Sequence, residues 1–102
     1  MKIFKLYKSS KQDKKYMIVT ETKKIHFGAN GYNDYIIYNK INKNTAYQKK
    51  RNYIKRHNIN ENWTDYNTSG FWSRWLLWNK PTLHDSITST EKRFNIKIIN
   101  NT

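Results

Sequence analysis

The stretch Gly70-Phe71-Trp72-Ser73-Arg74-Trp75-Leu76-Leu77-Trp78-Asn79-Lys80-Pro81 decides the fold. Within it Phe71, Trp75 and Trp78 follow one another at i, i+4 and i+7, the spacing of one face of an α-helix. The adjoining stripe is also apolar, so the segment 70–78 is apolar over more than half of its circumference. The pattern predicts a core helix that ends before the proline, because proline disfavours helical geometry in the residue preceding it. Its tryptophans are expected in the core.

A second helix is predicted from about Thr45 to His57. Thr45 and Gln48 have the spacing of a capping box, which satisfies free backbone amides in the first turn. Tyr47 and Ile54 lie seven residues apart and are expected to share its inner face. Asn67, Thr68 or Ser69 is expected to cap the core helix.

A third helix is predicted over about 82–94. Thr82 and Asp85 have the capping-box spacing at its start, and we expect a capping role for Asp85. Leu83, Ile87 and Phe94 share one face, while Glu91, Lys92 and Arg93 are expected outside.

Alternating apolar residues predict strands at about 2–7, 16–20 and 25–27, and a short final strand over 96–99. The segment from Tyr35 to Ile41 suits either a short strand or the lead-in to a helix. The sequence therefore predicts an α+β fold in one basic domain, 1–102. A small N-terminal antiparallel sheet (about 2–27) would be packed by two or three helices (about 45–94).

Gly28-Ala29-Asn30-Gly31 holds two of the three glycines of the chain. Such a stretch is a site for positive φ angles. It suits a tight exit from the sheet, and the alternative is a backbone nest for a phosphate, for which two spaced glycines are a weak signal.

The charge and the cysteine content of the sequence limit the functions that the protein can have. The 20 Lys+Arg residues exceed the 7 Asp+Glu residues, which gives a formal net charge of +13. Such a field on a small domain attracts polyanions. The absence of cysteine excludes disulfides, thiolate metal sites and Cys nucleophiles. The start of the sequence lacks an apolar signal segment, and 70–78 is too short to span a bilayer, so we expect neither secretion nor a membrane partner.

Four blocks of the sequence resemble a family of small basic proteins of nucleocytoplasmic large DNA viruses, such as mimivirus-like and phycodnavirus-like agents. They are Ile25–Tyr35 (IHFGANGYNDY), Tyr53–His57, Glu61–Asp65 and Gly70–Leu83 (GFWSRWLLWNKPTL), within about residues 16–94. The polar insert around Asn39 to Asn44 departs from the family pattern. The resemblance implies a viral setting, in a virion or in the virus factory of the host cytoplasm, and assigns no catalytic residue.

Charge, size and this resemblance favour a non-enzymatic protein that binds nucleic acid through its phosphates, in genome condensation or packaging. We expect DNA in preference to RNA and weak sequence specificity, because a lysine contact is a point charge. The oligomeric state, including a homo-oligomer, stays open. The basic residues expected at phosphates are Lys49, Lys50, Arg51, Lys55, Arg56, Arg74, Lys80, Lys92 and Arg93.

Trp63 lies in an Asn-rich loop, and it is the ring we expect at the rim, where it could stack on an unpaired base. Two alternatives remain. One is a virion structural or interaction protein that binds an acidic protein partner. The other is a small metal-dependent nuclease built on His26, His57 or Asp34, although no metal-ligand spacing is recognisable. No cofactor, metal ligand or catalytic residue is assigned.

Overall fold

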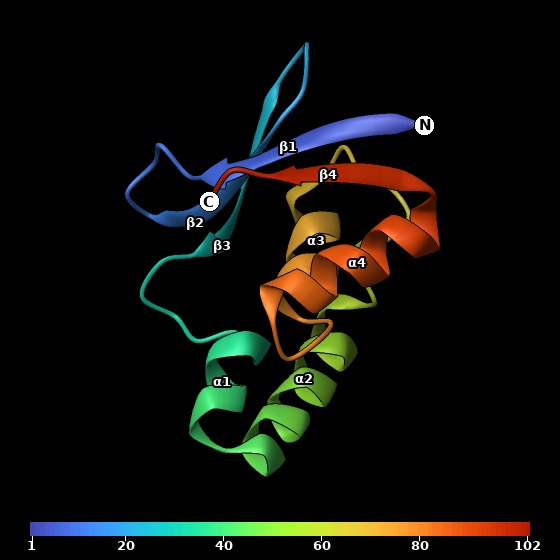
Figure 1. Ribbon diagram of the computed structural model, residues 1–102. Coiled ribbons are helices and arrows are strands. Elements are labelled where there is room, and N and C mark those ends of the chain that lie inside the picture. The colour runs from blue at the N-terminus through green and yellow to red at the C-terminus, as the bar shows by residue number, and fades with distance from the viewer.

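The computed structural model describes residues 1–102 and confirms an α+β fold (Figure 1). In chain order the elements are β1 (Lys2–Lys8), β2 (Lys14–Val19), β3 (Lys24–Ala29), α1 (Tyr35–Ile41), α2 (Lys43–His57), α3 (Ser69–Trp72), the π-helix η1 (Ser73–Leu77), α4 (Leu83–Phe94) and β4 (Ile96–Asn100). No helix is both long and apolar enough to cross a membrane.

The sheet has the strand order β3-β2-β1-β4. The predicted antiparallel meander is confirmed, since β1 pairs with β2 and β2 with β3 in antiparallel register. The sequence predicts no direction for the final strand, and β4 runs parallel to β1, so the whole sheet is mixed. Parallel neighbours need a crossover connection, and the helical segment before β4 supplies it.

One face of the sheet is covered by α3, η1 and α4 (Figure 1). The alternation in β1 turns Phe4 and Leu6 toward this layer, where they meet Phe71 and Trp72, both fully buried. The predicted core helix is therefore confirmed, with Thr68 as its cap through a hydrogen bond from the Phe71 N–H.

The core helix differs from the prediction in its second half, which widens into the π-helix η1. The Trp78 N–H donates to the carbonyl of Ser73, five residues earlier, at 3.1 Å. The Trp75 carbonyl accepts a hydrogen bond from the Thr90 hydroxyl of α4 at 3.2 Å. Apolar periodicity does not distinguish a π turn from an α turn, so no pattern in the sequence indicates it.

The helices α1 and α2 form a hairpin, here called the helical arm, at the end of the molecule away from the sheet (Figure 1). The expected cap at Thr45 is wrong: Asn42 caps α2 by accepting from the Thr45 N–H. The expected inner position of Tyr47 is also wrong, since its side chain is 57% exposed. Ala46 and Tyr53 are the buried residues of α2, so its inner face lies on their side of the helix.

Both glycines of the Gly28–Gly31 turn have positive φ angles, 78° and 89°. At Gly28 an added Cβ would lie 2.6 Å from Cδ1 of Leu77, whereas at Gly31 it would meet nothing within 4 Å. The close approach of η1 thus explains Gly28 as a packing position, in line with the tight exit from the sheet.

The third predicted helix, α4, begins where predicted, but two of its residues have other roles than expected. Thr82 is the capping residue and accepts from the Asp85 N–H at 3.1 Å, so Asp85 lies in the first turn and is not the cap. Glu91 is not simply an outer residue, because its carboxylate accepts from the Ile98 N–H at 2.9 Å. That bond ties the helix to β4.

Candidate functional site

The five basic side chains of α2 that were predicted to contact phosphates point in three different directions from the helix. Lys49 and Arg56 line a cleft between α2 and the sheet. Lys50 points toward the turn after η1, while Arg51 and Lys55 lie on the outer, exposed side of the helix. Successive residues of an α-helix diverge by about 100°, so a run of adjacent cations cannot share one face.

Four of the predicted cations come together at the junction of α2, η1 and α4. This basic cluster consists of Lys50, Arg74, Lys80 and Arg93. Both guanidinium groups lie 4.4 Å from the ring centre of Trp75. The Lys50 Nζ donates to the carbonyl of Asn79 at 2.6 Å and lies 4.8 Å from the ring centre of Tyr35.

The cluster has no carboxylate partner. The two ion pairs of the chain, Lys15 with Asp34 and His57 with Glu61, lie outside it. Burial lowers the pKa of Lys50, and the neighbouring charges of Arg74 and Lys80 lower it further. Burial also lowers the pKa of the Arg74 guanidinium. Both effects mean that the protein holds these positive charges at a cost in free energy, which a bound anion would offset.

Arg74 extends from η1 with part of its donor capacity unused. Its Nη1 donates to the Trp78 carbonyl at 2.7 Å, but its buried Nε has no hydrogen-bond partner. A buried donor without a partner costs about 1–3 kcal/mol, so a ligand or water that reached it would stabilise the site.

Three tryptophans, Trp63, Trp72 and Trp75, pack beneath or beside the junction of α2, η1 and α4. Trp72 and Trp75 are buried, and their indole N–H groups donate to the carbonyls of Tyr66 and Trp63 at 2.9 and 2.8 Å. Trp63 is half-buried, lies nearly parallel to Tyr53 and has the Arg74 guanidinium 5.3 Å from its ring centre. Much of the ring predicted for base stacking is therefore already packed against protein groups.

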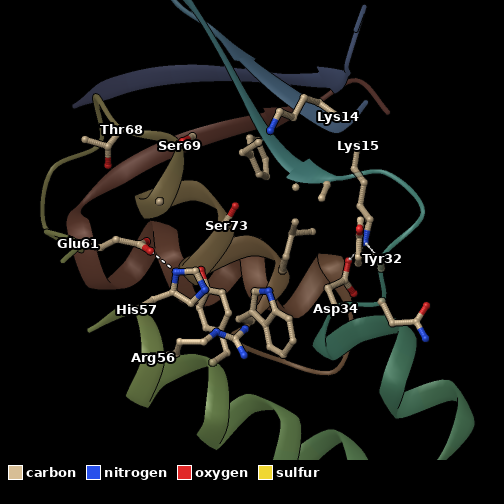
Figure 2. Close-up of a pocket in the computed structure, with 18 of the residues that line it drawn as sticks. Lys14, Lys15, Tyr32, Asp34, Arg56, His57, Glu61, Thr68, Ser69 and Ser73 are labelled. Carbon is tan, nitrogen blue, oxygen red and sulfur yellow. Dashed lines mark hydrogen bonds and ion pairs between the residues drawn. The ribbon is translucent and has the colours of Figure 1, made fainter. Parts of the chain in front are cut away.

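A cleft of about 730 Å³ separates α2 from the end of β3. Figure 2 shows Arg56, His57 and Glu61 on one side and Lys14 and Lys15 on the other. The positive charge of the cleft comes from both sides. No sequence pattern places the two strand lysines opposite α2, because only the chain fold brings them there.

The cleft also holds two ion pairs, each between an acidic and a basic side chain, that the sequence did not indicate. The buried Asp34 carboxylate pairs with the Lys15 ammonium at 2.8 Å and caps α1 by accepting from the Ile37 N–H. Glu61 pairs with His57 and accepts from the Trp63 indole N–H at 3.1 Å. The nearby charge of Glu61 adds to burial in raising the pKa of Tyr53.

The remaining predicted positions lie outside the basic cluster. Lys92 lies on the exposed side of α4, turned away from its neighbour Arg93. His26 lines the cleft, and its ring shares a hydrogen bond with the Ser9 hydroxyl. Nowhere in the chain do three or more His, Asp or Glu side chains gather in a way that could hold a metal ion.

Comparison with known proteins places the chain in a family. Residues 4–57, from β1 to the end of α2, match the model of a family of unknown function, DUF5754. No curated protein matches, and neither does any solved structure. Since the matched residues make up more than half of the sequence, the chain belongs to the DUF5754 family.

Proposed function

We propose that this protein is a non-enzymatic nucleic-acid-binding protein that holds DNA mainly through its phosphates. The observation that carries the proposal is the basic cluster, in which Lys50, Arg74, Lys80 and Arg93 gather without a carboxylate. Like charges at close range destabilise the free protein, and phosphate oxygens supply the missing negative charge.

The unused Nε of Arg74 and the half-buried position of its guanidinium add to this argument. Arginine binds phosphate with its planar fork, and a partly desolvated guanidinium does so more strongly than an exposed one. The cations of the cleft, including Lys49 and Arg56, would extend the contact beyond the cluster. A role in genome condensation or packaging, in a virion or virus factory, rests on the resemblance to proteins of large DNA viruses.

The test is binding of labelled double-stranded DNA, single-stranded DNA and duplex RNA, each titrated with salt and followed by fluorescence anisotropy. Lys80→Gln with Arg93→Gln removes two exposed cations from the cluster. The matched control, Lys5→Gln with Lys97→Gln, removes the same charge from exposed sheet positions. Every phosphate that the protein no longer neutralises should reduce the log–log salt slope by about 0.9, so the slope of the cluster variant should fall by up to about 1.8.

The control should change the slope much less. An equal reduction in both variants would mean that net charge, and not the cluster, governs binding. If the unmodified protein binds none of the three nucleic acids near physiological salt, the proposal is wrong. Degradation of DNA that needs Mg²⁺ or Mn²⁺ and is abolished on changing His57 would instead support the nuclease alternative.

A second candidate function, binding of an acidic protein partner in a virion, is favoured by the sheet face that no helix covers (Figure 1). On that face Ile3 lies beside Lys97 and Lys5 beside Ile99, so exposed apolar and basic side chains alternate. Polyglutamate is a suitable probe. If it binds as tightly as DNA and the Lys5→Gln/Lys97→Gln variant no longer binds it, the partner is an acidic polypeptide.

A further inference from the structure

The helical arm carries charge of one sign only. Between Tyr35 and His57 the sequence has seven Lys and Arg residues and no Asp or Glu. The arm lies at the end of the molecule away from the sheet, so its outer side is free of the other elements (Figure 1). A projecting, wholly basic helical hairpin is electrostatically complementary to a polyanion.

The outer face of α2 is polar and regular. Its members are exposed and follow one another at spacings that keep them on one side of a helix. They are Asn44, Gln48, Arg51, Asn52 and Lys55. The buried residues Ala46 and Tyr53 lie outside this set, on the side of α2 that packs against the protein. The face is therefore open to a ligand.

The hydrogen-bonding groups of this face are free. None of the side-chain hydrogen bonds at α1 and α2 involves a side chain of this face. The side chains that make them are those of Asn39, Lys50 and His57 and of the caps Asp34 and Asn42. Asn and Gln amides match the N6 and N7 edge of adenine, and Arg and Lys match O6 and N7 of guanine. The face therefore combines the side chains that read base edges, with no carboxylate to repel phosphates.

The dimensions of α2 suit one groove of the double helix. Its 15 residues span roughly 22 Å at about 1.5 Å per residue, and an α-helix with its side chains is about 10–12 Å across. The major groove of B-DNA is about 12 Å wide. Asn52 lies where the outer face meets the cleft, and beside it Lys49 and Arg56 can meet one phosphate strand.

We propose that α2 is a recognition helix that lies in the major groove of duplex DNA and reads base edges with Asn44, Gln48 and Asn52. This inference rests on the proposed function and adds a sequence preference to phosphate binding. Duplex RNA is not an equivalent ligand, because its major groove is deep, narrow and closed to a helix.

The experiment starts with selection of preferred sites from a random duplex DNA library by the unmodified protein. Affinity for the selected site is then compared with that for a scrambled duplex and for duplex RNA of the same sequence. The test variant is Asn44→Ala, Gln48→Ala and Asn52→Ala, which keeps the charge and suits a helix. The matched control, Gln12→Ala, Asn67→Ala and Asn101→Ala, removes the same amides from exposed positions elsewhere.

We expect the affinity of the test variant for the selected site to fall roughly 5- to 150-fold for each amide that reads a base. The affinity of the test variant for scrambled DNA, and the log–log salt slope of that binding, should equal those of the unmodified protein. The control variant should still prefer the selected site to scrambled DNA. Selection without a preferred site, or equal binding of duplex RNA, would overturn the recognition helix while leaving phosphate binding intact. Absence of binding to every nucleic acid would overturn the proposed function as well.

Discussion

A single methyl group at Gly28 tests the packing between β3 and η1. The substitution Gly28→Ala brings a Cβ to 2.6 Å from Cδ1 of Leu77, where an ordinary carbon contact is about 3.5–4.0 Å. The overlap of about 1 Å must be relieved by moving the buried leucine, and overpacking of this kind costs about 1–3 kcal/mol. The positive φ angle of 78° adds about 1–2 kcal/mol for an L residue.

Gly31 is the matched control, because its φ angle is 89° and an added Cβ meets nothing within 4 Å. Gly31→Ala should therefore cost only the conformational part, about 1–2 kcal/mol. Gly28→Ala should lower the free energy of unfolding by about 1–3 kcal/mol more than Gly31→Ala. Urea denaturation followed by tryptophan fluorescence measures both.

The Leu77→Ala background identifies the cause of the difference. Removing the leucine methyl groups opens most of the space, so the costs of Gly28→Ala and Gly31→Ala should then differ much less. The close neighbour that remains at Gly28 is Cβ of Lys15, 3.3 Å from the added Cβ. Equal costs in the unmodified background, or a difference that is just as large without the Leu77 side chain, would refute the packing explanation of Gly28.

Three further predictions concern stability. Burial raises the pKa of Tyr53, so the unfolded chain ionises first and stability should fall as pH rises above about 10; Tyr53→Phe should lessen this fall in urea unfolding at alkaline pH. Asp34→Asn should cost about 3 kcal/mol, because it leaves the Lys15 charge buried without its partner, and adding Lys15→Met should recover part of the decrease in melting temperature. Asn42→Ala should cost about 1 kcal/mol and Thr45→Ala far less, as chemical denaturation would show; the reverse order would contradict the assigned cap.

Local patterns in the sequence predicted the fold well where one element decided the outcome. The spacing of Phe71 and Trp75 predicted the core helix, and the alternation around Phe4 predicted a strand with one buried face. The capping-box spacing identified the helix start correctly at Thr82 and wrongly at Thr45. The same spacing also occurs inside a helix, and whether a residue is the cap depends on the backbone conformation at that residue.

The candidate site was less predictable, because distant segments build it. The sequence marked Lys50 and Arg74 as basic, but their approach depends on how the chain fold places α2 beside the end of η1, where Tyr53 stacks on Trp78. The pairing of Lys15 with Asp34 depends on the turn after β3, and no spacing rule indicates it. Periodicity assigns a residue to a face of its own helix, and it does not say which other element that face meets.

The pairing of β1 with β4 also sets an order of events during folding. Lys2 lies beside Ile96 and Leu6 beside Asn100, so this pair closes a loop that contains all the other elements. Contacts so distant in sequence form slowly, whereas a hairpin of adjacent helices needs only local closure. During synthesis the helical arm can therefore form before β4 has left the ribosome, while β1 still presents an open edge. A nascent chain of this protein would acquire its basic helices first and its finished sheet last.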